Sequence, residues 1–199
     1  LETGFLRGGR PQMITLVFFL EERSAKALLE GLLPRVLSMD EFAIHYVPFE
    51  GKQDLEKQLV RKMRGWRTPE THFVVLRDQD NGRCKDVKKR LFGLCHKAGH
   101  PEALIRIACR ELESWYLGDL AAVEKALQIN GLAKKQLSKK FRNPDQLHKP
   151  SHELRRLTTG LYQKIAGSRA IGPHLDLEGK NHSKSFRVFI SGLEKCTSS

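Results

Sequence analysis

The stretch Phe73-Val74-Val75-Leu76-Arg77-Asp78-Gln79-Asp80-Asn81-Gly82 decides how the rest of the chain is interpreted. Its apolar start predicts a buried strand, and its final Asn-Gly predicts a turn. Two carboxylates at positions i and i+2, just after a parallel strand, can point toward one place if the backbone leaves the extended conformation there. Such oxygen ligands suit hard cations such as Mg²⁺. The alternative is a polar turn in which Asp78 and Asp80 cap the next helix.

The composition is typical of a globular protein with a polyanionic partner. The chain has 199 residues, of which 40% are hydrophobic and 29% charged, enough for one domain with a substantial core. Lys and Arg number 35 against 23 Asp and Glu, so the formal net charge is +12. This charge favours nucleic acid as a partner, with solubility alone as the alternative. No apolar run approaches the roughly 20 residues that span a bilayer, so we expect no membrane association.

The cysteines and the first residues bear on location and processing. Cys84, Cys95, Cys109 and Cys196 are scattered and form no Cys-x-x-Cys pair, which predicts reduced thiols in a cytoplasmic protein. No stretch has the pattern of a secretory signal peptide. Residues 1–12 show no periodicity and precede a methionine, so we expect them to be a non-native leader or disordered.

Strands and helices are expected to alternate through the first 130 residues. The apolar patterns predict strands over residues 14–20, 42–47, 73–76 and 104–108. They predict helices over residues 25–37, 55–63, 87–98 and 113–127. This order predicts an α/β fold with a mostly parallel four-stranded sheet flanked by helices, in a core domain that spans residues 13–130.

The pattern changes after residue 130. Short helices are predicted over residues 151–157, 162–169 and 183–195, and they form a basic helical extension, residues 131–199, packed on the core. A basic tract precedes these helices and comprises Lys134, Lys135, Lys139, Lys140 and Arg142. We expect this tract to contact a phosphate backbone, with a solvated face as the alternative.

Acidic residues follow three of the four predicted strands. Glu21 follows the first strand, Asp78 and Asp80 follow the third, and Glu111 and Glu113 follow the fourth. Because carboxyl ends of parallel strands share one edge, these carboxylates should lie close together and repel one another. One or two divalent cations bound there would remove the repulsion and could promote phosphodiester hydrolysis. The alternative is neutralisation by nearby arginines, namely Arg77, Arg106 and Arg110.

The order strand–Glu, helix, strand, helix, strand–Asp-x-Asp, helix, strand resembles the toprim domain of primases, topoisomerases and OLD-type nucleases. Within that superfamily, the chain looks most similar to a bacterial group of short toprim-like proteins. The resemblance covers nearly all of residues 13–193. The matching segments are Leu20-Glu21-Glu22-Arg23-Ser24, Asp78-Gln79-Asp80 and Glu111-Leu112-Glu113-Ser114-Trp115-Tyr116-Leu117-Gly118-Asp119.

The resemblance implies a nuclease, or nuclease subunit, that depends on Mg²⁺ or Mn²⁺. It implies that Glu21 is the first-strand acid and that Asp78 and Asp80 are metal ligands. Many toprim proteins have Gly where this chain has Glu22, so the first-strand acid is either Glu21 or Glu22. An ABC-type ATPase partner is implied as well, because relatives are encoded beside such ATPases in phage-defence operons. A non-catalytic subunit that binds nucleic acid or regulates an ATPase is the alternative.

Further candidates lie outside the strand ends. Lys164 and Arg169 belong to a Gly-punctuated segment whose cations could stabilise charge on a reacting phosphate. We assign Lys164 a catalytic role and Arg169 a role in nucleic-acid binding. Trp115 and Tyr116 recur with leucines at helical spacing and are expected in the core. Asp119 is expected to form an ion pair on a helix surface.

Overall fold

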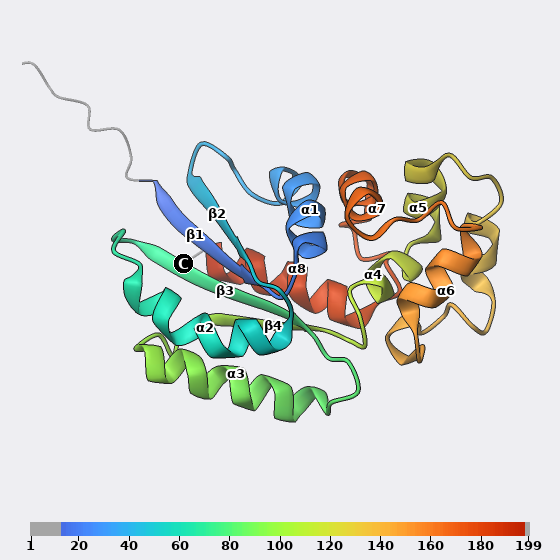
Figure 1. Cartoon of the computed structure of the whole chain (residues 1–199). Coiled ribbons are helices and arrows are strands. Elements are labelled where there is room, and N and C mark those ends of the chain that lie inside the picture. Colours follow the sequence, from blue (N-terminus) through green and yellow to red (C-terminus); the bar gives the residue numbers. More distant parts are fainter. Residues whose placement is uncertain (1–12, 198–199) are drawn as a thin grey trace, which may run out of the picture.

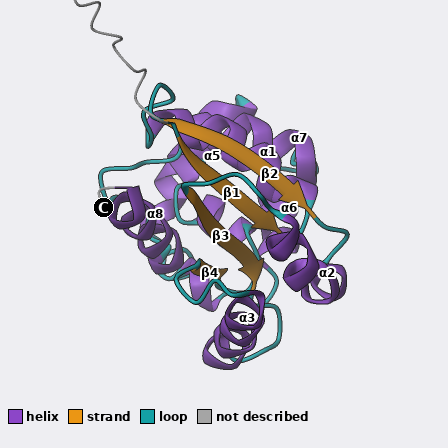
Figure 2. Ribbon diagram, turned by 90° about the vertical axis from the view of Figure 1, so that its left-hand side faces the viewer, coloured by secondary structure: helices purple, strands orange, loops and turns teal. Residues whose placement is uncertain are grey.

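Four parallel strands form the central sheet of the computed structural model, which describes residues 13–197. The strand order is β2-β1-β3-β4, and Figure 2 shows the strands running in the same direction. The α/β fold with a parallel four-stranded sheet is therefore confirmed. The expectation for residues 1–12 lies outside the described residues. The strands are β1 Ile14–Leu20, β2 Phe42–Pro48, β3 Thr71–Asp78 and β4 Leu104–Ala108.

Helices α2 (Lys52–Gly65) and α3 (Cys84–Ala98) cover one face of the sheet, the lower face in Figure 1. They pack against Val17 and Phe19 of β1 because alternate side chains of a strand point to opposite faces. The helix residues buried in this layer are Leu55, Leu59, Met63, Val87, Leu91 and Cys95. Helical spacing of these residues explains why both segments form amphipathic helices.

The opposite face is covered by α1 (Arg23–Leu32), the short helix α4 (Glu113–Leu117) and α8 (Lys184–Thr197). Trp115 and Tyr116 are fully buried in this layer, which confirms that they are core residues. Since this core contains residues from both halves of the chain, the C-terminal segment packs directly on the sheet. No helix within residues 13–197 is long and apolar enough to cross a membrane.

The helix predicted over residues 113–127 is divided in two. Gly118 separates α4 from α5 (Leu120–Leu127), and a Cβ at Gly118 would lie only 2.7 Å from the Ser183 nitrogen of a crossing segment. Asp119 then begins α5, where its Oδ1 accepts a hydrogen bond from the Ala122 N–H at 3.0 Å. The predicted surface ion pair of Asp119 is therefore wrong: this carboxylate is a helix cap.

Residues 119–180 form a helical cap beyond the carboxyl ends of the strands (Figure 1). Its helix α7 packs on α1, and a Cβ at Gly172 would lie 2.5 Å from the Leu28 carbonyl oxygen. The two segments therefore touch with no side chain between them at this point. Besides α5, the cap contains α6 Pro150–Leu157, α7 Lys164–Ile171 and the 3₁₀ turns Ala133–Leu137, Pro144–Gln146 and Gly172–His174. Another 3₁₀ turn, Leu33–Arg35, follows α1.

The strand order creates a topological switch point between β1 and β3. From β1 the chain passes through α1 to β2, whereas from β3 it passes through α3, on the opposite face, to β4. The chain thus diverges in opposite directions from two adjacent strands. Open α/β sheets bind their ligands outside the carboxyl ends of the strands at such a point. Glu21 follows β1 there and Asp78 ends β3, so the fold places both at the expected ligand position.

Candidate functional site

Glu21 and Asp78 meet at the switch point. The Asp78 backbone N–H donates a hydrogen bond to Glu21 Oε2 at 3.0 Å. Arg77 Nε lies 3.7 Å from the same oxygen, but the guanidinium of Arg77 makes its close ion pair with Glu56 on α2. The Glu21 carboxylate is thus oriented by the backbone of the neighbouring strand and not by a bidentate arginine.

Glu113, the first residue of α4, is a buried acid, with 1% of its surface exposed. Its Oε1 accepts a hydrogen bond from the Tyr162 hydroxyl at 2.9 Å. Its Oε2 has no hydrogen-bond partner among the described residues. A buried polar atom without a partner is costly, so an unpaired carboxylate oxygen favours a bound proton or cation.

Lys164, the first residue of α7, places its ammonium group beside these acids. Its Nζ lies 2.6 Å from Glu22 Oε1, next to the start of α1. Burial opposes the charge of Lys164, but the bond to Glu22 and the nearby carboxylates of Glu113 and Asp78 outweigh burial and raise its pKa. We call Glu21, Glu22, Asp78 and Glu113 the acid cluster. Contact between α1 and α7 holds Lys164 against it.

The acid cluster carries more negative charge than Lys164 can neutralise. Burial is the main reason that the pKa of Asp78 is raised well above its usual value, and the charges of Glu21, Glu113 and Glu22 raise it further. Burial also raises the pKa of Glu21 and of Glu113. These shifts mean that ionising Glu21, Asp78 and Glu113 together is unfavourable in this protein. A bound cation would offset that cost.

The donor atoms of the acid cluster fit a hard divalent cation. All of them are carboxylate oxygens, and one, Glu113 Oε2, is buried and unpaired among the described residues. In the described part of the chain, no group of three or more His, Cys, Asp or Glu side chains is arranged as a ready metal site. An ion would therefore have to draw the carboxylates of Glu21, Asp78 and Glu113 closer together.

Asp80 and Glu111, also predicted as metal ligands, have other partners. Asp80 lies at φ +55°, where the chain leaves β3, and its Oδ2 accepts a hydrogen bond from Lys52 Nζ at 2.7 Å. Glu111 Oε2 accepts a hydrogen bond from the Ser151 N–H at 2.7 Å and so caps the start of α6. Asp80 still lies near enough to raise the pKa of Glu21, after the larger effect of burial. The structure thus groups three of the five predicted ligands.

Three adjoining cavities, which we call the edge groove, run along the carboxyl edge of the sheet. The first has a volume of about 220 Å³ and is lined by Glu113, Ser151, His152, Arg155, Tyr162 and Lys164. The second, also about 220 Å³, shares Ser151 and His152 with it and extends to Asp80, Arg110 and Lys149. The third, about 410 Å³, shares Asp80 and extends to Lys52, Arg83 and Arg90. Glu113 and Lys164 connect the acid cluster to this groove.

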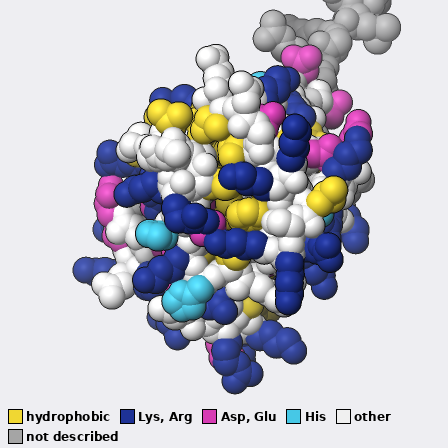
Figure 3. Space-filling view, turned by 90° about the vertical axis from the view of Figure 1, so that its right-hand side faces the viewer, with side chains coloured by type: hydrophobic (Ala, Val, Ile, Leu, Met, Phe, Trp, Pro, Cys, Tyr) yellow, Lys and Arg dark blue, Asp and Glu magenta, His cyan; other side chains and the backbone are white. Residues whose placement is uncertain are grey.

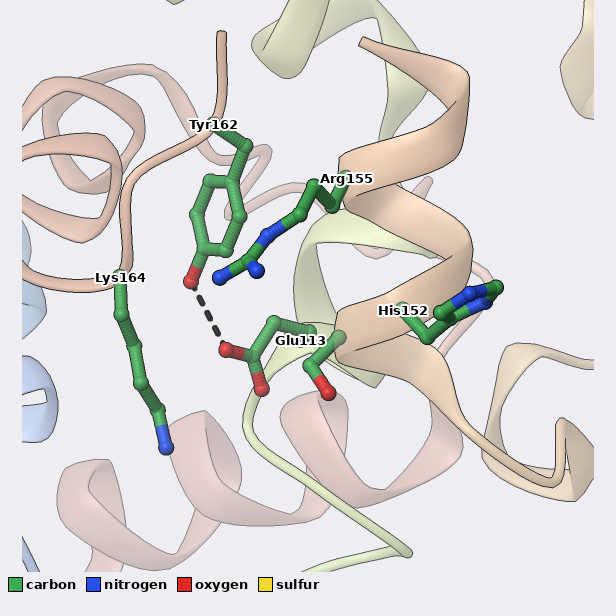
Figure 4. Close-up of a pocket in the computed structure, with 6 residues that line it drawn as sticks. Glu113, His152, Arg155, Tyr162 and Lys164 are labelled. Carbon is green, nitrogen blue, oxygen red and sulfur yellow. Dashed lines mark hydrogen bonds between the residues drawn. The ribbon is translucent and has the colours of Figure 1, made fainter. Parts of the chain in front are cut away.

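Tyr162 and Arg155 are candidate site residues that sequence reasoning missed. Figure 4 shows Arg155 reaching from α6 toward Tyr162 and Glu113, with Lys164 alongside on the other side of Tyr162. Tyr162 lies 49 positions from Glu113 in the chain, and no motif links the two residues. Only the docking of the cap on the sheet brings them together.

Replacing Tyr162 by Phe tests how Glu113 is held. This change removes the hydroxyl that donates to Glu113 Oε1, so we expect it to destabilise the fold by about 1–3 kcal/mol at pH 8. The pKa of Glu113 is raised, mainly by burial, and Tyr162 favours the charged form. The destabilisation should therefore shrink as the pH falls and Glu113 takes up a proton.

Urea unfolding at pH 5 and pH 8 measures this effect. Tyr46→Phe is the matched control, because Tyr46 is half-buried on β2 and its hydroxyl donates no hydrogen bond to a described residue. If both variants lose the same free energy of unfolding, or if the loss for Tyr162→Phe does not depend on pH, Tyr162 does not hold the charged form of Glu113.

The basic tract lies on the outer surface of the cap. Figure 3 shows Lys and Arg side chains spread over this side of the molecule. Lys134, Lys135 and Lys139 are exposed. Lys140 Nζ pairs with Glu153 at 2.8 Å, and Arg142 Nε donates a hydrogen bond to the Leu137 carbonyl at 3.1 Å. Arg169, also predicted to bind nucleic acid, lies 3.9 Å from Glu30 on α1.

Comparison with known proteins identifies a family. No curated protein and no solved structure matches the chain. Residues 20–194 match the family model described as "Domain of unknown function (DUF4276)". This match includes all four residues of the acid cluster as well as Tyr162 and Lys164. The chain belongs to the DUF4276 family.

Proposed function

We propose that the acid cluster is the catalytic centre of a metal-dependent, toprim-like nuclease that hydrolyses phosphodiester bonds. One observation carries the proposal: the buried, unpaired Glu113 oxygen lies in a cluster of acids that faces Lys164 and opens on the edge groove. Buried carboxylates with raised pKa values, gathered in a cavity at a switch point, are typical of functional sites.

The residues of the site have separable roles in this proposal. Glu21, Asp78 and Glu113 would hold Mg²⁺ or Mn²⁺, which supplies Lewis-acid stabilisation and lowers the pKa of water. Tyr162 orients Glu113 through its hydrogen bond. Lys164 offsets charge that builds on the phosphate oxygens, and Glu22 orients Lys164. Glu21, rather than Glu22, is then the first-strand ligand, because Glu22 is engaged by Lys164.

We also propose that nucleic acid, DNA or RNA, is the substrate and that the protein acts in the cytoplasm. The net charge of +12, the basic tract and the cations along the edge groove all favour a polyanion. All four cysteines are free thiols, as expected for a reducing compartment. An ABC-type ATPase remains the proposed protein partner, on the resemblance alone.

Replacing Lys134, Lys135, Lys139 and Lys140 by Ala should weaken nucleic-acid binding and its salt dependence. Each lysine that pairs with a phosphate releases condensed counterions, so the slope of log K against log salt should fall by roughly one unit for each such lysine replaced. The control variant replaces Lys57, Lys62, Lys88 and Lys89, which lie on the surface of α2 and α3. Fluorescence anisotropy over a salt series measures the slope. Equal slopes for both variants would show that the basic tract is only a solvated surface.

A cleavage assay tests the catalytic proposal directly. Single- and double-stranded DNA and RNA are incubated with the protein and Mg²⁺, Mn²⁺ or EDTA, with and without the proposed ATPase. We expect cleavage that requires the metal and is lost in Glu113→Gln. The matched control is Glu178→Gln, because Glu178 is an exposed acid that pairs with Lys180 on the cap surface. Metal-independent cleavage, or equal rates for the two variants, would refute the assignment.

A non-catalytic subunit that binds nucleic acid or regulates an ATPase is the second candidate. The ion pair between Asp80 and Lys52, at 2.7 Å, favours it, because one predicted metal ligand is already neutralised by a lysine. This candidate predicts binding without cleavage under every condition of the assay. It also predicts that Mg²⁺ does not raise the melting temperature.

A further inference from the structure

The first cavity of the edge groove contains a cation that neither the fold nor the acid cluster uses. Arg155 extends from α6 into this cavity, and its guanidinium makes no hydrogen bond or ion pair within residues 13–197. Its neighbour Arg156, in contrast, pairs with Glu153 at 2.7 Å. A free guanidinium that faces a cavity can bind an outside anion through two parallel hydrogen bonds.

Three further groups make this cavity a built site. Lys164 lines it, and so do the Tyr162 hydroxyl and the buried Glu113 carboxylate with its unpaired oxygen. Lys164 is already paired with Glu22, so Arg155 is the cation in the lining of this cavity that has no ion pair with a described residue. An anion that enters therefore meets the guanidinium of Arg155, with the ammonium group of Lys164 on the other side of Tyr162.

We propose that this cavity binds the terminal phosphate monoester of a nucleic-acid strand. The inference rests on the proposed function, since it assigns a strand end to the groove that leads to the acid cluster. The cavity adjoins the second cavity through Ser151 and His152, and it stands at the end of the row of three. A strand that follows the groove would end there.

Charge and size distinguish a strand end from an internal linkage. A phosphate monoester carries close to two negative charges at neutral pH and three terminal oxygens, which can accept two hydrogen bonds from Arg155 and a further one from Lys164. An internal phosphodiester carries only one charge. The volume of about 220 Å³ is below the roughly 300 Å³ at which pockets for whole small molecules begin, so it suits a terminal group.

Binding in EDTA tests the proposal without any cleavage. Short single-stranded oligonucleotides of DNA and RNA are compared with a 5′-phosphate, a 3′-phosphate or hydroxyl groups at both ends. We expect one phosphorylated end to bind at least about tenfold more tightly than the hydroxyl form, since two charge-assisted pairs are added. Arg155→Gln should remove this preference, and Arg155→Lys should keep part of it. Arg156→Gln, the same charge change one residue away, should leave it intact.

The possible outcomes separate the two proposals. Equal binding of phosphorylated and hydroxyl oligonucleotides by the wild type, or no binding of either, overturns the phosphate site even if cleavage occurs. A preference that survives in Arg155→Gln, or is lost equally in Arg156→Gln, overturns it as well. A preference that requires Arg155, in a protein that never cleaves, supports the site and refutes only the nuclease. A nucleoside monophosphate in a parallel arm shows whether a free nucleotide binds as well as a strand end, which would overturn the assignment to strands.

Discussion

Asp78→Asn should reduce cleavage to background while leaving the fold at least as stable as the wild type at neutral pH. The amide keeps the shape of the carboxylate but removes the charge that would hold a divalent cation. The same change removes a carboxylate that burial and its acidic neighbours make costly to ionise.

The direction of the stability change follows from proton linkage. The pKa of Asp78 is higher in the folded than in the unfolded state, so the folded protein binds more protons and loses stability as the pH rises above about 4. Because Asn cannot ionise, the Asp78→Asn variant does not lose stability in this way as the pH rises. In metal-free buffer, the melting temperature of Asp78→Asn should therefore match the wild type near pH 4 and equal or exceed it at pH 7.5.

Melting curves with and without Mg²⁺ complete this test. Mg²⁺ should raise the melting temperature of the wild type, because an ion that binds only the folded state stabilises it, and should not shift Asp78→Asn. Asp40→Asn is the control, because Asp40 is an exposed acid in the loop before β2. Marked destabilisation of Asp78→Asn in EDTA, with no Mg²⁺ shift in the wild type, would show that Asp78 belongs to a salt-bridge scaffold.

Lys164→Gln should lower the cleavage rate by about 100- to 1000-fold, the usual effect of removing one group that stabilises transition-state charge. It should also destabilise the folded state at pH 8. Lys164 offsets the charges of Glu22, Glu113 and Asp78, and these carboxylates would be left without its charge. As the pH falls, the acids are protonated and the absence of Lys164 should matter less.

Lys26→Gln is the matched control for this variant. Lys26 is 41% exposed and pairs with Glu30 on α1, whereas Lys164 is 45% exposed and pairs with Glu22. Rates are measured at saturating Mg²⁺, and unfolding is measured from pH 5 to pH 8. If both variants lose activity and stability equally, Lys164 is an ordinary surface lysine.

Local sequence patterns are sufficient to predict the four-stranded sheet and the positions of Glu21 and Asp78. The ranges predicted for β1 and β4 agree with the structure, because both strands are short and largely apolar runs. The positions of Glu21 and Asp78 follow from the rule that parallel strands share a carboxyl edge. The same rule predicts Glu113, although this residue lies five positions after β4 on the first turn of α4.

The errors arise where distant segments set the local geometry. Gly118 ends α4 because residues 181–183 cross it, which no local pattern shows. The spacing of Asp80 in the sequence suggests that it acts together with Asp78. In the structure, Asp80 has a positive φ and its carboxylate pairs with Lys52 on α2 instead. The contact of Tyr162 with Glu113 depends on how the cap docks on the sheet. The hydrophobic periodicity and the secondary-structure propensity of a segment contain no information about such contacts.

The close approach of Gly172 to the Leu28 carbonyl gives a criterion for judging relatives of this protein. A methyl group at position 172 would meet a backbone oxygen, and backbone cannot turn aside as a long side chain can. A homologue with a bulky residue there would have to separate α7 from α1, and its equivalent of Lys164 would move away from the acids. If the proposed function holds, homologues that keep all the carboxylates but lack glycine at this position are therefore expected to be inactive. Counting acidic residues in an alignment would not distinguish them from homologues that keep Lys164 beside the acid cluster.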